Sequence, residues 1–256
     1  MSADGAGSSE VLDFLRGVRS VRRFSPKAVP AEVLDEALRV AQRAPSASNL
    51  QQYHVIEIQD VALRERVFDA MVTQDFVRRA PVVFLTCIDW SKMAWLAAHA
   101  GAERIPSGEV ARFLGAVEGS IFTHHLALAL MAQGLGVCCI ASPYTNLREV
   151  ARLLEIPPGS AMPLHMVVAG YPAEAPGPRP RLPMTAVRSV DRYVPPNPDE
   201  LRDYFESAER ALMAEEYFAK YDTGAVDLGS HLRTKFGAVG HGRTWEPMAK
   251  DLETFL

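Results

Sequence analysis

The stretch that decides the fold runs from residue 19 to residue 24 and reads Arg19-Ser20-Val21-Arg22-Arg23-Phe24. Two arginines stand three residues apart, and a serine hydroxyl lies between them. Guanidinium groups form paired, charge-assisted bonds to phosphate oxygens, and a hydroxyl can donate to a third oxygen. A solvated basic end of a helix would show the same residues, so this segment alone leaves both interpretations open.

A second polar segment follows a predicted amphipathic helix over residues 30–44, where apolar residues recur every three or four positions. Pro45 ends that helix, and the small residues Ser46, Ala47 and Ser48 come next. Small side chains let a ligand approach the backbone closely. Asn49 and Gln51 each offer paired donors and acceptors, the alternation that the edge of a flavin ring presents. An ordinary turn is the alternative.

A third segment, residues 178–183, carries Arg179 and Arg181 among three prolines. Proline stiffens an extended chain, so both arginines can project from it. The alternatives are a solvated linker or a ligand for a proline-recognition domain.

In this order, the three segments resemble the FMN-dependent nitroreductase family. The resemblance covers residues 11–193, with its opening pattern at 14–51, a strand and loop at 134–143, and a closing pattern at 170–174 followed by the arginines. Two positions depart from it. Val18 stands where many members carry a basic residue, and Gln52 replaces the usual proline.

The resemblance assigns roles around one FMN. Arg19 and Ser20 would hold the phosphate and ribityl end, and Arg22 would stabilise the reduced pyrimidine ring electrostatically. The remaining expected contacts come from the small-residue loop, from a strand-end loop near N5 and O4, and from the two late arginines near the phosphate: Pro45, Ser46, Ala47, Ser48, Asn49, Gln51, Ala141, Ser142, Arg179 and Arg181.

The family implies an α+β three-layer sandwich, with a mainly antiparallel central sheet flanked by helices, in a domain-swapped homodimer. It implies reduction of a nitroaromatic, quinone or similar acceptor by NADH or NADPH in a ping-pong cycle. The chemistry would lie on flavin N5, with no catalytic side chain and no metal. Alternatives are an oxidase or reductive dehalogenase on the same fold, or a flavin-binding protein without turnover.

Composition is that of a globular chain: 256 residues, 48% hydrophobic and 23% charged, with a net charge of −4. This balance does not favour nucleic acid. We see no signal peptide and no apolar run of membrane-spanning length, so we expect a cytoplasmic protein without a membrane partner. Three cysteines without metal spacing fit a reducing compartment.

We expect three regions: a disordered start at 1–10, an FMN-binding domain at 11–193, and a helical extension at 194–256 that wraps the partner subunit. Within the extension, residues 201–220 predict one helix, and the tail beyond Asp222 shows little pattern. Whether Trp90, Trp95 or His124 contact a substrate stays open at this point.

Overall fold

The computed structural model describes residues 5–71, 74–105, 107–221, 224–236 and 245–254. The chain divides into two compact units: Met1–Pro176 together with Trp245–Leu256, and Gly177–Thr244. The first unit holds the sheet, and the described elements of the second are helices.

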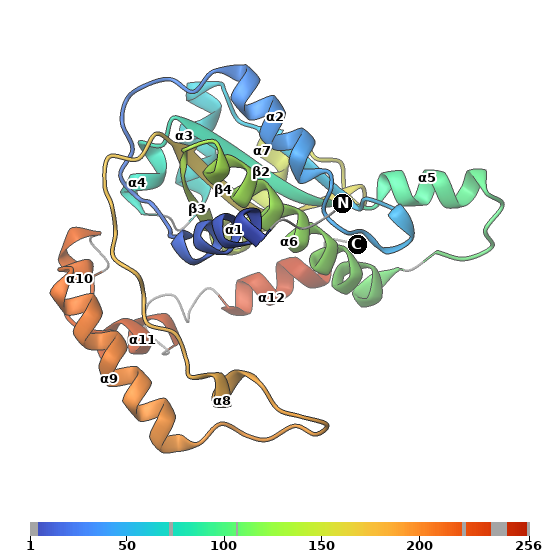
Figure 1. Ribbon diagram of the computed structural model, residues 1–256. Coiled ribbons are helices and arrows are strands. Elements are labelled where there is room, and N and C mark those ends of the chain that lie inside the picture. Colours follow the sequence, from blue (N-terminus) through green and yellow to red (C-terminus); the bar gives the residue numbers. More distant parts are fainter. Residues whose placement is uncertain (1–4, 72–73, 106, 222–223, 237–244, 255–256) are drawn as a thin grey trace. The chain divides into compact units, whose positions relative to one another are not determined.

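The sheet of the first unit has four strands in the order β1-β2-β4-β3, and every neighbouring pair is antiparallel (Figure 1). The strands are β1 (Tyr53–Glu57), β2 (Val82–Asp89), β3 (Gly136–Ile140) and β4 (Ala161–Gly170). Every residue of β2 is buried, because helices cover both faces of this central strand. The predicted antiparallel sheet is confirmed.

Helices cover both faces and complete three layers, as expected. On one face, Phe84 and Val167 pack with Leu126 of α6 (Gly108–Ala132), and α2 (Ala31–Ala41) joins the same core. On the other face, Leu85 and Val168 form a core with residues of α3 (Val61–Ala70), α4 (Asp75–Arg78) and α7 (Leu147–Leu153). Successive side chains of a strand point to opposite faces, so β2 serves both cores.

Helix α6 runs across the sheet and positions much of the candidate site. Among the described helices it is the one long and apolar enough to cross a membrane by length and composition alone. Half of its most apolar window is buried inside the protein, where it packs on the sheet and on α2. The helix therefore acts as a core helix of the first unit.

The ends of the chain differ from the sequence-based expectation. Helix α1 (Gly5–Gly17) begins inside the segment expected to be disordered. The helix expected at 201–220 is divided into α9 (Pro198–Ala214) and α10 (Tyr217–Lys220), because Glu216 has a positive φ of 52°. Periodicity cannot reveal such a left-handed residue when it is not glycine.

Beyond Asp222 the structure contains α11 (Leu228–Phe236) and α12 (Trp245–Thr254), where the sequence showed little pattern. Helix α12 belongs to the first unit, where Asp251 pairs with Arg148 at 3.1 Å. The two compact units divide after Pro176. The expected extent of the FMN-binding domain, residues 11–193, stays a prediction. Two further α-helices complete the description. Helix α5 (Ser91–His99) belongs to the first unit and α8 (Met184–Val187) to the second.

Candidate functional site

The arginine segment lies beside strand β3. Ser20 forms a parallel bridge with Val137, and the Val21 backbone N–H donates to the Val137 carbonyl at 2.9 Å. This close approach needs glycine at position 136, since a Cβ there would lie 2.7 Å from the Val21 side chain. Strand β3 is therefore hydrogen-bonded directly to the arginine segment at 19–24.

Residues after β4 hold the other side of the same segment. Glu174 Oε1 accepts from the Arg22 backbone N–H at 2.7 Å and from that of Arg23 at 3.1 Å. The Ala173 N–H donates to the Arg23 carbonyl at 2.9 Å. The closing pattern therefore fixes the backbone that carries Arg19, Ser20 and Arg22.

Ser20 and Arg22 both act on the Cys138 thiol of β3, Ser20 through a hydrogen bond and Arg22 through its charge. Burial raises the pKa of this thiol, while the positive charge of Arg22 and a hydrogen bond from Ser20 partly oppose that rise. Both predicted ligands therefore lie along the strand whose far end leads to Ala141 and Ser142. Ala141 is exposed, and Ser142 begins the short 3-10 helix η2 (Ser142–Asn146).

The Pro45–Gln52 loop has an unusual backbone. Ser48, Asn49 and Gln51 have positive φ values of 52°, 55° and 52°. Each left-handed non-glycine residue costs about 1 kcal/mol or more. A loop that keeps three of them must be held by its surroundings, and such strain concentrates at functional sites.

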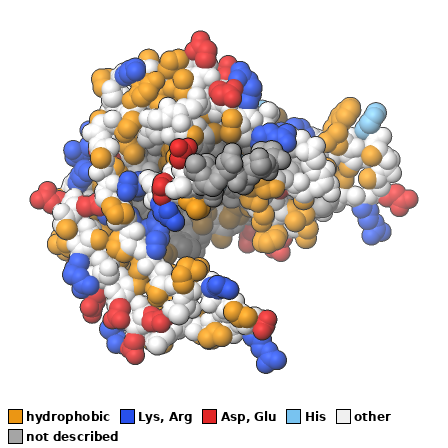
Figure 2. Space-filling view, in the orientation of Figure 1, with side chains coloured by type: hydrophobic (Ala, Val, Ile, Leu, Met, Phe, Trp, Pro, Cys, Tyr) orange, Lys and Arg blue, Asp and Glu red, His pale blue; other side chains and the backbone are white. Residues whose placement is uncertain are grey.

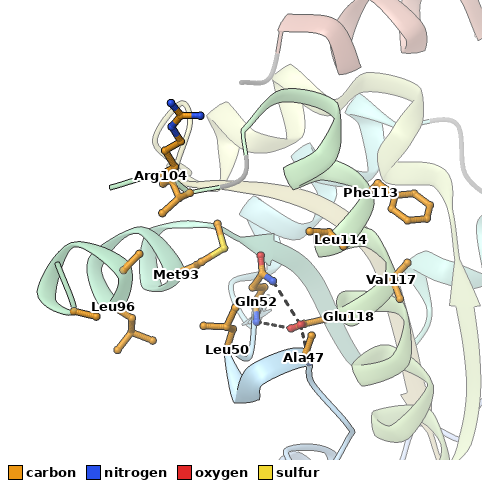
Figure 3. A pocket seen from close by; sticks show the side chains of 13 residues that line it. Ala47, Leu50, Gln52, Met93, Leu96, Arg104, Phe113, Leu114, Val117 and Glu118 are labelled. Atoms are coloured by element: carbon orange, nitrogen blue, oxygen red, sulfur yellow. Dashed lines mark hydrogen bonds between the residues drawn. The ribbon is translucent and has the colours of Figure 1, made fainter. Parts of the chain in front are cut away.

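The group that holds this loop is Glu118 of α6, which is only 5% exposed. Its two carboxylate oxygens accept from the Ser46 hydroxyl, the Ala47 N–H and the Gln52 N–H, each at 3.0 Å. Figure 3 shows Glu118 facing Ala47 and Gln52. Ser46 Oγ accepts in turn from the Gln51 N–H at 2.8 Å, so its proton points to Glu118. One carboxylate thus organises the loop from Ser46 to Gln52.

Sequence reasoning did not single out Glu118. The signal available was a lone acidic residue within the apolar stretch 114–132, where an unpaired carboxylate would be costly. The proline usual after Gln51 has no N–H to donate. Gln52, which stands there in this chain, supplies that donor to the carboxylate.

The late arginines lie in the second unit. Arg179 forms an ion pair with Glu215 at 2.7 Å, and its guanidinium lies 4.7 Å from the centre of the Tyr217 ring. Its Nη1 is buried and has no hydrogen-bond partner among the described residues. Arg181 is exposed and donates to the carbonyls of Arg179 and Pro180 at 3.3 Å. Their expected convergence on a phosphate stays a prediction.

Within one chain, the arginine segment at 19–24 and the small-residue loop at 45–52 lie beside different parts of α6. Arg19 borders a cavity of about 360 Å³ that Met131 also lines, whereas Ser46 binds Glu118. Glu118 and Met131 are 13 residues apart on one helix, which corresponds to about 20 Å. The arginine segment and the small-residue loop therefore lie toward opposite ends of α6.

Of the three side chains left open, Trp90 is buried and donates to the Ala111 carbonyl at 3.1 Å, which indicates a packing role. Trp95 is 64% exposed and stacks on His99. His124 is exposed.

Comparison with known proteins agrees with this architecture. The model of the Nitroreductase family matches residues 15–171, more than half of the chain. An FMN reductase [NAD(P)H] of Bacillus subtilis is 32% identical over 218 residues, covering 84% of this chain and 86% of the relative. An oxygen-insensitive NADPH nitroreductase of Salmonella typhimurium is 28% identical and covers 88% of this chain and 90% of its own length.

Among solved structures, B. megaterium NfrA2 superposes with a TM-score of 0.80 at 24% identity, covering 96% of this chain and 98% of its own. An NADPH:FMN oxidoreductase from Vibrio harveyi, solved with NAD+, gives a TM-score of 0.76 at 20% identity, covering 94% of this chain and 97% of its own. These two likenesses establish the fold.

Proposed function

Since the chain belongs to the nitroreductase family, we propose that it is an FMN-dependent oxidoreductase that uses NADH or NADPH to reduce a nitroaromatic, quinone or similar electron-poor acceptor. The flavin, when bound, would accept hydride from the nicotinamide and pass the electrons on to the acceptor. The observation that carries this proposal is the strained, small-residue loop that Glu118 holds.

The residues of the chain fit such a cofactor. Ser20 and Arg22 lie beside β3, Ala141 and Ser142 follow its far end, and Arg19 is exposed. An extended ligand anchored at one end of the strand can reach the other, because five strand residues span about 16 Å. The buried Nη1 of Arg179, which has no hydrogen-bond partner among the described residues, suits an anionic group.

A homodimer with FMN at its interface would bring the two separated parts together. The loop of one subunit would cover the flavin that the arginine segment of the other subunit holds. Apolar side chains gather on the surface along α5 and the first half of α6 (Figure 2), where Trp95, Phe113 and Val117 are 64%, 69% and 46% exposed. Such a face suits burial against a second copy. We further propose that residues 194–256 wrap the partner and that the protein is cytoplasmic.

Flavin bleaching tests the function. Purified protein mixed with FMN under anaerobic conditions should hold the flavin through gel filtration, and NADH or NADPH should then bleach its absorbance near 450 nm. A nitroaromatic or quinone should restore the colour. Flavin that stays bound and unbleached with both nicotinamides would instead indicate a flavin-binding protein without turnover.

A further inference from the structure

A cavity of about 540 Å³ lies between α5, α6 and the Glu118-held loop (Figure 3). This volume is typical of small-molecule sites. The side chains around it are mostly apolar, including Leu50, Met93 and Leu114. Its rim contains Leu96 and Phe113, which are exposed in the single chain, so the cavity has an open side there.

One polar side chain in this lining has an unpaired atom. Gln52 is 3% exposed, and its Oε1 is buried without a hydrogen-bond partner among the described residues. Its Nε2 faces Glu118 Oε1 at 3.5 Å. A carboxylate can only accept, so the NH₂ of the amide must take this side. Glu118 thereby fixes the amide orientation and turns Gln52 Oε1 away from itself, toward the cavity (Figure 3).

A buried acceptor without a donor is unfavourable, and a ligand that supplies the donor recovers this cost. A ligand that brings only acceptors adds repulsion instead. We propose that the α5–α6 cavity binds a ring-sized apolar molecule that donates an N–H or O–H to Gln52 Oε1. That this molecule is the electron acceptor rests on the proposed function. Acceptors whose polar groups are all hydrogen-bond acceptors, such as simple quinones, are then disfavoured here.

A matched pair of probes tests the proposal. 4-Nitroaniline and 4-nitrotoluene have the same ring and nitro group and nearly the same size, but only the first carries a donor. Calorimetry on the FMN-loaded protein, without any nicotinamide, should show 4-nitroaniline bound at least about tenfold more tightly. In Gln52→Leu, which removes the acceptor and keeps an apolar side chain, the two probes should bind within about twofold of each other.

Ala97→Phe provides a second variant that leaves Gln52 intact, because Ala97 lines the cavity from α5. Filling the space should abolish binding of both probes. Equal binding of the two probes to the original protein, a preference that survives in Gln52→Leu, or binding unaffected by Ala97→Phe would each overturn the proposal. A donor preference in a protein that NADH and NADPH fail to bleach would keep this inference and reject the proposed function.

Discussion

The loop at 45–52 and the late arginines of the segment at 178–183 were expected to bind the same cofactor, yet the structure holds them in different ways. A single buried carboxylate fixes the loop through three bonds of 3.0 Å. In the segment at 178–183, Arg179 pairs with Glu215 of its own unit at 2.7 Å, whereas Arg181 is exposed and, among the described residues, donates only to nearby carbonyls at 3.3 Å. The loop is preorganised within the first unit, whereas the side chain of Arg181 stays exposed to solvent.

We expect the largest effect from a substitution of Glu118, which holds the loop at 45–52. In Glu118→Gln, an amide NH₂ replaces one oxygen and faces backbone N–H donors that it cannot accept from. We expect a loss of about 3 kcal/mol in the free energy of unfolding and at least about tenfold weaker FMN binding. Thermal denaturation and fluorescence titration measure the two effects. Glu109→Gln, on the exposed first turn of α6, is the matched control. Equal behaviour of the two variants would contradict the role given to Glu118.

The second prediction concerns the arginine segment at 19–24, which is held against β3. In Gly136→Ala, the new Cβ would meet Val21 at 2.7 Å and push the arginine segment away from β3. We expect a loss of about 2 kcal/mol in stability, with weaker FMN binding. Gly17→Ala makes the same change two residues before Arg19 and should be nearly neutral, because among the described residues none beyond its chain neighbours and its own helix backbone lies within 4 Å of the added Cβ. A stable Gly136→Ala with unchanged FMN affinity would show that this close approach is unimportant.

The next prediction concerns Arg181 in the segment at 178–183. Because Arg181 is exposed and, among the described residues, donates to the carbonyls of its own segment, Arg181→Ala should leave the melting temperature nearly unchanged. If it closes on the phosphate, FMN should bind about tenfold more weakly, and the salt dependence of binding should decrease. Arg188→Ala, also exposed and in the same unit, controls for general charge. Equal FMN affinity in both variants would remove Arg181 from the site.

The smallest effect concerns pH. The Nε2 atom of His165 on β4 lies 3.4 Å from Ser120 Oγ of α6. Burial lowers the pKa of His165. The unfolded chain takes up a proton near pH 6.5 that the folded protein resists, so stability should fall as the pH drops below about 6.5. His165→Gln should make that acid decline shallower in denaturation curves from pH 7 to 5. An identical slope in both proteins would exclude this contribution.

Much of the fold followed from local patterns. The amphipathic spacing at 30–44 correctly predicted a helix, which the structure has as α2 (Ala31–Ala41), and the ordered motifs predicted the antiparallel sheet and the family. The loop's anchor did not follow. Glu118 is 66 residues from Gln52, and only the packed position of α6 brings them together. The left-handed backbone at Glu216 and the place of α12 in the first unit leave no mark in the spacing of apolar residues.

The central claim is that one FMN uses the arginine segment of one subunit and the loop of the other, and complementation tests it directly. Arg22→Ala and Glu118→Gln should each fail to retain FMN when expressed alone. Co-expressed with different affinity tags, they should form heterodimers that retain one FMN per dimer, since one of the two sites then has both parts intact. Heterodimers that retain no FMN would contradict the account, because that result requires both parts to come from the same chain.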